Sequence, residues 1–510
     1  MNFKSILSVA AGTLLVLAVF TSCSDDSSGS DPILPSVTAP SAANVLVGES
    51  VELSFSVSTA EGYSSSSVSA SNGTASVTSE PSSGATSGSV VVEFTASAAG
   101  AGSVELTVTD QEGQTDDATA VVSVVEEETT IRIVDNITED TTWETGKIYI
   151  LGGRIAVEAG ATLTIEEGVI VKGEAGTGAN ASALLVARDA TLNANGTAEN
   201  PIIFTSVADE IVPDGFNRAK ASPNLDPDIN GLWGGVIVLG NAPISAATSP
   251  AQIEGIPTSD TNGLYGGDDP TDSSGTIRYI SIRHGGSNIG EGNEINGLTL
   301  GGVGSGTVIE NVEVVANQDD GVEWFGGNVD VDGILVWNSG DDGLDTDQDW
   351  IGTASNFLIV TPVGGSAFEL DGPEGDLNRG CHMFSNGIIY AGDEIDHLVD
   401  FDGGTNAGLM DVYFYGLDPS YSAVADDPAT EDDESFNPVE TFGGDGNCTS
   451  GNWEYTLAEG GATVDQVFTG VPGGALTEVA ANANSVGPDI SRFSWTWAST
   501  SGALGSIGLE

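Results

Sequence analysis

Acidic side chains recur at a regular spacing in the second half of this chain, and they are the residues best suited to chemistry. Each of five carboxylates follows an apolar residue in a short segment typical of a β-strand: Glu323, Asp345, Glu369, Asp400 and Glu440. Other carboxylates lie in the turns before these segments or two residues further along them: Asp319, Asp320, Asp341, Asp342, Asp347, Asp371 and Asp402. On neighbouring strands, about 5 Å apart, such groups would raise one another's pKa.

Two interpretations of these carboxylates stay open. No lysine follows Lys220 to neutralise them, so they either point into water as a face suited to high salt or hold a metal ion. Clustered carboxylate oxygens suit Ca²⁺, a hard cation with several oxygen ligands. The densest candidate is the segment 341–349, which ends at Asp349 and lacks the ligand spacing of an EF-hand. We expect Ca²⁺ or another divalent cation here.

The strands that must position these carboxylates also recur. The centres of one strand series, Val312, Ile334 and Phe357, are about 22 residues apart, and a second strand follows each centre after about 10 residues. The second series predicts that one column of apolar residues points into a core: Val322, Leu344, Phe368, Val399 and Val439. The adjacent acidic column should then point outward, because side chains alternate along a strand.

This coil length, with two or three short strands, is typical of a right-handed parallel β-helix. Over about residues 130–450 the chain resembles the pectin-lyase-like β-helix superfamily, through the coil period, the segment Gly160-Ala161-Thr162-Leu163-Thr164-Ile165 and the Asn and Gly residues at the turns. The resemblance implies an all-β fold. It does not decide an activity, because the superfamily includes lyases, hydrolases, esterases and non-enzymes.

Two further segments flank the β-helix, which we place at residues 127–450. Residues 36–126 carry about seven short strands and resemble an immunoglobulin-like β-sandwich of bacterial cell-surface proteins, whose expected role is a spacer. Residues 451–510 are expected to cap the β-helix end or to return along its side, with 493–498 as an alternating strand.

The N-terminus predicts export. Residues 1–22 have the charge and apolar run of a secretory signal, and the small residues before Cys23 resemble a bacterial lipobox, which implies lipidation of that cysteine. The alternative is an ordinary signal peptide with an incidental cysteine. Residues 23–35 form an acidic flexible tether that resembles the surface-export signal of Bacteroidetes lipoproteins. This resemblance implies an outer-membrane lipoprotein exposed at the cell surface.

Composition narrows the classes of function. The net charge of −63 argues against nucleic-acid binding, because phosphate backbones would be repelled. Three cysteines are too few for a disulfide-built scaffold. An exported compartment permits a disulfide between Cys381 and Cys448, although the sequence leaves open whether they meet.

Two functions therefore compete. We favour a non-catalytic binding or adhesion scaffold that presents divalent cations and binds polysaccharide or a surface protein. The alternative is a calcium-dependent polysaccharide lyase or a glycoside hydrolase, for which Arg283 and His284 are the weak catalytic candidates. The other possible bases are Arg379, His382 and His397. The polygalacturonase pattern of an Asp pair, Gly-His-Gly and Arg-Ile-Lys is incomplete and out of order here.

Aromatic side chains could stack on sugars. Four are candidates for this role, with core packing as the alternative: Trp337, Trp350, Tyr413 and Tyr415.

Overall fold

The computed structural model forms two compact units, Met1–Glu127 and Glu128–Glu510, each described by itself. The structure describes residues 33–213, 221–287, 295–360, 364–392, 395–401, 405–417, 448–468, 471 and 473–509. Cys23 and most of the tether lie outside these residues, as do Asp402, Val439 and Glu440. Among the described residues no helix combines the length and the hydrophobicity needed to cross a bilayer.

The first unit is a β-sandwich. Its strands are β1 (Ser36–Thr38), β2 (Ala43–Leu46), β3 (Ser50–Ser58), β4 (Tyr63–Ser71), β5 (Gly73–Ser79), β6 (Ser87–Ala96), β7 (Gly100–Asp110) and β8 (Thr115–Val125). They form two four-stranded sheets, β1-β3-β6-β5 and β2-β8-β7-β4. Alternating apolar residues such as Phe55, Phe94 and Leu106 are fully buried between the sheets. The immunoglobulin-like resemblance stays a prediction.

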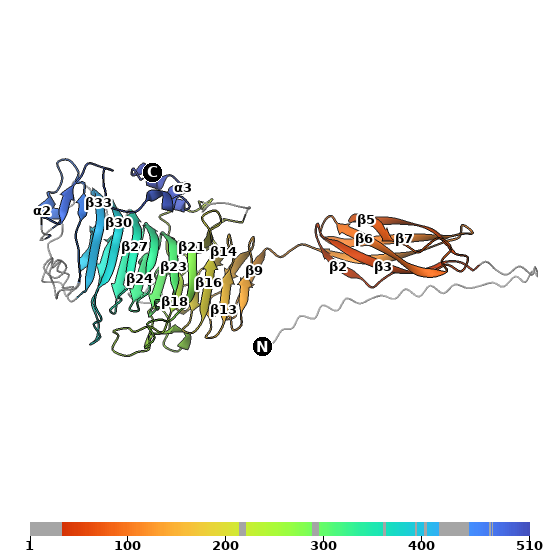
Figure 1. Cartoon of the computed structure of the whole chain (residues 1–510), viewed down its shortest axis with the longest axis horizontal. Coiled ribbons are helices and arrows are strands. Elements are labelled where there is room, and N and C mark those ends of the chain that lie inside the picture. Colours follow the sequence, from red (N-terminus) through yellow and green to blue (C-terminus); the bar gives the residue numbers. More distant parts are fainter. Residues whose placement is uncertain are drawn as a thin grey trace, which may run out of the picture. The chain divides into compact units, whose positions relative to one another are not determined.

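The second unit contains the predicted parallel β-helix, and this fold prediction is confirmed (Figure 1). An eight-stranded sheet contains β12 (Arg154–Val157), β15 (Ala183–Val186), β18 (Val236–Leu239), β22 (Leu298–Gly301), β24 (Val322–Phe325), β26 (Leu344–Asp347), β29 (Phe368–Leu370) and β32 (Asp400–Phe401), in this order. Every pairing within it is parallel, for example β24 with β26. The strands predicted at Val322 and Leu344 are confirmed as β24 and β26.

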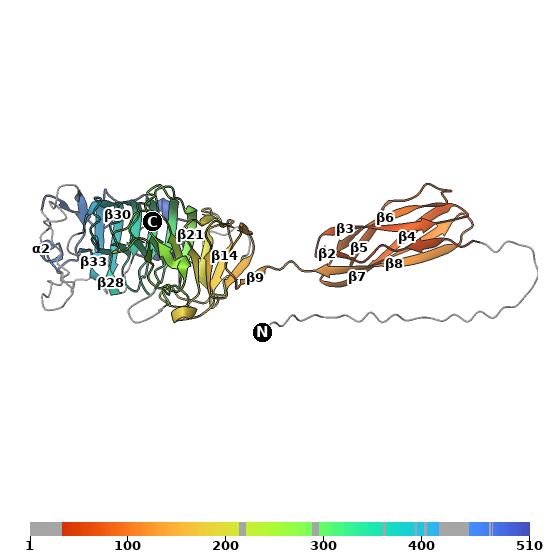
Figure 2. The same cartoon turned by 90° about the horizontal axis from the view of Figure 1, so that it is seen from below.

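A fifteen-stranded sheet closes the rest of each coil (Figure 2). Its strands are β9 (Thr130–Ile133), β10 (Thr141–Trp143), β11 (Ile148–Leu151), β13 (Thr162–Ile165), β14 (Ile170–Gly173), β16 (Thr191–Asn195), β17 (Ile202–Ser206), β21 (Gly275–Arg283), β23 (Val308–Val315), β25 (Val331–Trp337), β27 (Thr353–Val360), β30 (His382–Gly392), β33 (Ala407–Leu417), β34 (Trp453–Tyr455) and β35 (Leu476–Glu478).

The long strands of this sheet bend in the middle. Asn311, Asn356 and Asn386 adopt positive φ at the bend, a conformation that asparagine tolerates better than most residues. The bend lets one strand serve two sides of the coil. In the earlier coils two separate strands form those two sides. The change occurs at β21, a long strand that pairs with both β16 and β17 of the preceding coil.

The core follows the predicted columns. Val322, Leu344 and Phe368 are aligned by the strand register and are fully buried in one cluster that runs through the β-helix. Trp324 stacks on Trp350 in this core with ring centroids 4.7 Å apart. The prediction that the apolar column points into the core is therefore confirmed for these residues.

Smaller elements lie outside the coils. They are η1 (Gly178–Asn180), the antiparallel pair β19 (Ala251–Gln252) and β20 (Leu264–Tyr265) with η2 (Thr261–Gly263) between them, and the parallel pair β28 (Gly364–Ser366) and β31 (Ile395–His397). The C-terminal region adds α2 (Val464–Val467), η3 (Ile490–Phe493), α3 (Trp497–Thr500) and α4 (Ala503–Ser506).

The predicted strand at residues 493–498 is wrong. Phe493 ends η3, and the Thr496 side chain accepts a hydrogen bond from the Ser499 backbone, which caps α3 at its start. Trp495 and Trp497 are nevertheless buried, against Tyr279 and Trp337 of the long strands. This C-terminal segment lies along the side of the β-helix (Figure 1).

Candidate cation site on the acidic face

The predicted acidic column exists as one row on the outer side of the eight-stranded sheet. Register pairs Glu323 with Asp345, Asp345 with Glu369, and Glu369 with Asp400. The turns before these strands add Asp320 and Asp342. The backbone amide of Asp342 donates to the Asp320 carboxylate at 3.0 Å. We call this surface of β24, β26, β29 and β32, with its preceding turns, the acidic face.

The alternative in which these carboxylates point into water does not hold for several of them. They point away from the apolar core, yet Asp320, Glu323 and Asp345 are only 6%, 6% and 7% exposed. Chain segments from other coils cover them. Asn296, just before β22, donates its side-chain amide to Glu323, and the loop after β18 reaches β26, where the Tyr265 hydroxyl donates to Gln348 at 2.8 Å.

Three of the buried carboxylates converge. Oxygens of Asp320, Glu323 and Asp345 all lie within 4.8 Å of one another. Asp345 Oδ1 is buried and has no hydrogen-bond partner, and neither has Oδ1 of the neighbouring Asn296. Two desolvated oxygen acceptors in one acidic group are unfavourable unless a proton, a hydrogen-bond donor or a cation compensates them.

A second group shares one member with the first. Oxygens of Asp319, Asp320 and Asp341 also lie within 4.8 Å of one another, and Asp341 is exposed. Asp320 therefore lies between an inner buried group and an outer group that reaches the surface. The ligands of each group come from adjacent coils, so the fold rather than the local sequence brings them together.

Burial raises the pKa values of these carboxyl groups, and neighbouring carboxylates raise them further. The pKa values of Asp320, Glu323 and Asp345 lie well above their ordinary range. Burial and the contact with Asp342 raise the pKa of Glu369 to about 10. Burial and the charges of Glu374 and Asp371 raise the pKa of Asp347 to about 8.

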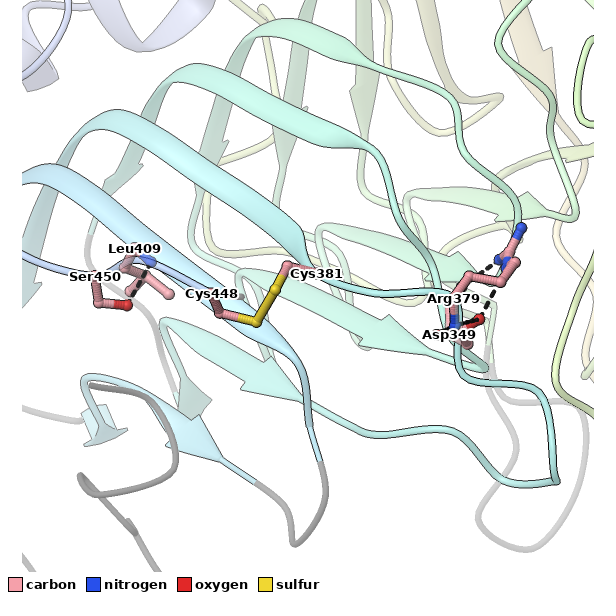
Figure 3. The surroundings of a disulfide bond; sticks show 6 residues. All are labelled: Asp349, Arg379, Cys381, Leu409, Cys448 and Ser450. Carbon is pink, nitrogen blue, oxygen red and sulfur yellow. Dashed lines mark hydrogen bonds and ion pairs between the residues drawn. A yellow bond between two sulfur atoms is a disulfide. The ribbon is translucent and has the colours of Figure 1, made fainter. Parts of the chain in front are cut away.

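The contiguous segment 341–349 is not a single site. Asp347 lies near Asp371 and Glu374 rather than in the inner group. Asp349 forms an ion pair with Arg379, whose Nε donates to Asp349 Oδ2 at 2.8 Å (Figure 3). Asp345 and Asp347 lie on the same side of β26 but two residues apart, and Asp349 lies beyond the end of the strand. Each carboxylate therefore has different neighbours, so density in the sequence overstated this candidate.

The two weak catalytic candidates do not meet the acidic face. Arg283 ends β21 in the fifteen-stranded sheet and is fully buried, with Nε donating to Ser281 Oγ at 2.8 Å and its guanidinium 4.8 Å from the Trp497 ring centroid. His284 is equally buried, and its Nδ1 contacts the Ile229 carbonyl. The C-terminal segment covers both residues, because Trp497 packs against Arg283 and His284.

The remaining candidate bases differ in position. His382 is buried beneath the acidic face with Nε2 3.2 Å from Thr346 Oγ1, and burial lowers its pKa to about 3. His397 lies on the acidic face, 3.8 Å from an Asp400 oxygen and 3.3 Å from Ser366 Oγ. It is about one-third exposed. Of the described histidines, His397 alone belongs to the acidic face.

The four aromatic residues expected to stack on sugars are all buried: Trp337, Trp350, Tyr413 and Tyr415. Core and side packing account for them, since Tyr413 stacks on Tyr415 and Trp350 on Trp324. Cys381 and Cys448 meet in a disulfide, which joins the segment before β30 to the segment before β34 (Figure 3).

The two segments that cover the acidic face were not found from the sequence. Asn296 and the loop after β18 cover the acidic face from other coils, and no spacing within the acidic strands indicates this. One available signal was the length of the segment between β18 and β21, which is much longer than a turn and carries apolar residues such as Ile253 and Ile256.

Comparison with known proteins identifies the fold family. Residues 135–391, half of the chain, match the family described as a pectate-lyase-like beta helix domain. No curated protein matches the chain. Among solved structures, a mutant of the SrpA adhesin from Streptococcus sanguinis aligns at 17% identity over 22% of this chain and 70% of that one, with a TM-score of 0.17.

A family 28 exopolygalacturonase from Yersinia enterocolitica also aligns, at 10% identity over 83% of this chain and 86% of that one, with a TM-score of 0.16. Because both TM-scores are this low, neither structure indicates the function of this chain.

Proposed function

The chain belongs to the pectate-lyase-like beta helix family, and on that premise we propose that it is a binding scaffold whose acidic face holds a divalent cation, with Ca²⁺ as the best-fitting ion. The observation that carries the proposal is the convergence of Asp320, Glu323 and Asp345, buried, with an unpartnered Asp345 oxygen. Several buried carboxylates without a counter-charge are strongly unfavourable, and a bound cation removes that cost.

No described side chain of opposite charge supplies the compensation. The four arginines that follow residue 220 all pair elsewhere, with Glu310, Glu313, Asp349 and Asp332. A cation from solution is therefore the natural partner of the inner group.

The donor set favours Ca²⁺ over other divalent ions. Carboxylate and amide oxygens suit hard cations, whereas Zn²⁺ prefers sulfur and nitrogen ligands. Mg²⁺ demands strict octahedral geometry and keeps several waters. A crowded set of carboxylates with the Asn296 amide oxygen beside it fits the more adaptable coordination of Ca²⁺. These residues would bind the ion and hold the covering segment against the acidic face.

The scaffold is proposed to act outside the cell. The signal-like residues 1–22, the lipobox-like Cys23 and the acidic tether support an exported lipoprotein attached to the outer membrane and exposed at the surface. Its ligand there would be a polysaccharide or a surface protein. Metabolic labelling with an alkyne palmitate, compared between the full chain and a Cys23→Ala variant, tests the anchor, and equal labelling of the two would contradict it.

Calorimetric titration of the purified chain with Ca²⁺ after EDTA treatment tests the cation proposal. We expect saturable binding that Asp345→Asn abolishes or weakens at least about tenfold. The matched control is Asp135→Asn, an exposed aspartate of the same unit, which should bind as the wild type does. Absence of saturable heat in the wild-type protein contradicts the proposal.

The second candidate function is polysaccharide cleavage on the same face. The observation in its favour is His397, a partly exposed base beside Asp400. The test is an assay for unsaturated uronates and for new reducing ends, on acidic and neutral polysaccharides with Ca²⁺ present. Activity that His397→Gln removes would favour the enzyme, and activity that persists in this variant would exclude His397 as its base.

A further inference from the structure

A small pocket of about 260 Å³ lies against the fifteen-stranded sheet, away from the strands of the acidic face. Its walls come from β30, β33, the segment after β34, the turn at Asn482 and Ile507 beyond α4. None of the residues that line it is charged, although the chain carries 75 acidic residues. A lining without charge offers no counter-charge to a metal ion or a polyelectrolyte, so it suits a neutral ligand better.

Tyr390 forms an aromatic wall of this pocket and is held in place from two sides. Gly416 has φ +75° and lies so close that a Cβ there would come within 2.4 Å of the Tyr390 ring. The Tyr415 ring meets Tyr390 at 5.2 Å in a T-shaped arrangement, and the Tyr415 hydroxyl donates to the Ile507 carbonyl at 3.1 Å. The aromatic wall is therefore preorganised by neighbours that are themselves fixed.

Polar groups stand at the same pocket. Tyr390 is half-buried, and its hydroxyl forms no hydrogen bond with the described residues. Asn482 is exposed, and its backbone amide donates to the Tyr413 hydroxyl at 3.3 Å. Its side-chain amide lies beside Gly508 and forms no hydrogen bond with the described residues. Thr456 adds a hydroxyl that already bonds Tyr413 and Val479.

We infer that this pocket binds one neutral pyranose unit, stacked on Tyr390 and hydrogen-bonded by Asn482 and the Tyr390 hydroxyl. A pyranose has an apolar C–H face and a rim of hydroxyls, which match one aromatic ring beside free amide and phenol groups. The volume lies below the roughly 300–1,000 Å³ of pockets that hold drug-sized ligands, so it suits a single ring.

This inference does not depend on the proposed cation site. β30 and β33 belong to the fifteen-stranded sheet, whereas the acidic face is built on the eight-stranded sheet. Sugar binding should therefore persist in EDTA, and its failure would leave the cation proposal untouched.

Saturation-transfer NMR on the full chain tests the inference, with methyl β-D-glucopyranoside, methyl β-D-galactopyranoside and methyl α-D-mannopyranoside as probes. We expect saturable binding of at least one probe, with a Kd of about 1 mM. Tyr390→Ala should weaken that binding at least about tenfold, because the stacking surface is lost. Tyr390→Phe keeps the ring and should retain most of the affinity.

The polar contact is tested by Asn482→Gly, which removes the amide and suits the positive φ of 57°. We expect it to weaken binding several-fold. The matched control is Asn452→Gly, another positive-φ asparagine outside the pocket, which should bind as the wild type does. Binding by none of the three probes overturns the inference, and so does unchanged binding in both Tyr390→Ala and Asn482→Gly.

Discussion

The outer side of the eight-stranded sheet has two halves of opposite character. In the early coils it carries apolar residues, among them Leu185, Ile237 and Leu239, which are buried against Ile253 and Ile256 of the loop after β18. In the later coils the same side becomes the acidic face, and its carboxylates are also buried. The backbone geometry is the same in both halves, so only the side chains explain the different energetics.

Burial has opposite consequences in the two halves. Each buried Leu or Ile contributes about 1.5–3 kcal/mol to stability when it leaves water. A buried carboxylate costs several kcal/mol unless a partner compensates it. The apolar half therefore needs nothing beyond its covering loop, whereas the acidic half requires a bound cation or protonation. This difference is the reason to place function at the acidic face.

The largest effect is expected in the apolar half. Ile237→Ala should lower the free energy of unfolding by about 2–5 kcal/mol, because it leaves a cavity in a fully packed site. Denaturant titration followed by circular dichroism measures it. The matched control is Val134→Ala, at an exposed position of the same unit, which should change little. The stability lost in Ile237→Ala should not be restored by Ca²⁺, because packing and not a cation stabilises the apolar half. Recovery of the variant in Ca²⁺, with no change in the wild type, would show that the two halves are not independent.

The next effect is removal of the cation from the acidic half. Because a ligand that binds only the folded state stabilises it by mass action, Ca²⁺ at about 100 times its Kd should add about 2.7 kcal/mol. Calorimetric melts of the same sample in EDTA and in Ca²⁺ measure this as a rise of several degrees in Tm. Superposed melts would mean that the acidic half is compensated in another way.

The pH dependence of the cation-free protein should be smaller, and it has a definite sign. Carboxyl groups whose pKa is raised by folding, such as Glu369 at about 10 and Asp347 at about 8, favour the folded state while they are protonated. That contribution is complete below their unfolded pKa near 4 and is lost as the pH rises toward 8–10. In EDTA we expect a higher Tm at pH 5 than at pH 8. A higher Tm at pH 8 would contradict this account.

The smallest effect, but one with opposite signs in two conditions, comes from Asp345→Asn. In EDTA the substitution removes a carboxyl group whose burial is costly in either protonation state and should raise the free energy of unfolding by about 1 kcal/mol. In Ca²⁺ it removes a ligand and should lower the stability relative to the wild type. Paired denaturant titrations measure both values, and a loss of stability in both conditions would indicate a purely structural carboxylate.

The repeat made the fold and the alignment of the acidic row predictable from the sequence. Spacing alone placed Val322 and Leu344 in the core and Glu323 beside Asp345, because parallel strands in successive coils must pair in register. Periodicity reports which side of a strand a residue faces. It does not report what covers that side.

Most of the features that the pattern missed have this cause. Burial of the acidic face depends on Asn296 and on the loop after β18, and burial of Arg283 depends on Trp497, which is far away in the sequence. Residues 493–498 form no strand because Thr496 provides a local cap that outweighs the alternating pattern. Long-range cover and capping chemistry are therefore the features that the sequence pattern missed.

The most direct test of the central claim is the titration of EDTA-treated protein with Ca²⁺, performed side by side on the wild type, Asp345→Asn and Asp135→Asn. The account predicts saturable binding in the wild type and Asp135→Asn, and its loss in Asp345→Asn. Binding that is absent from the wild type, or equal in all three proteins, would contradict a cation site at Asp320, Glu323 and Asp345.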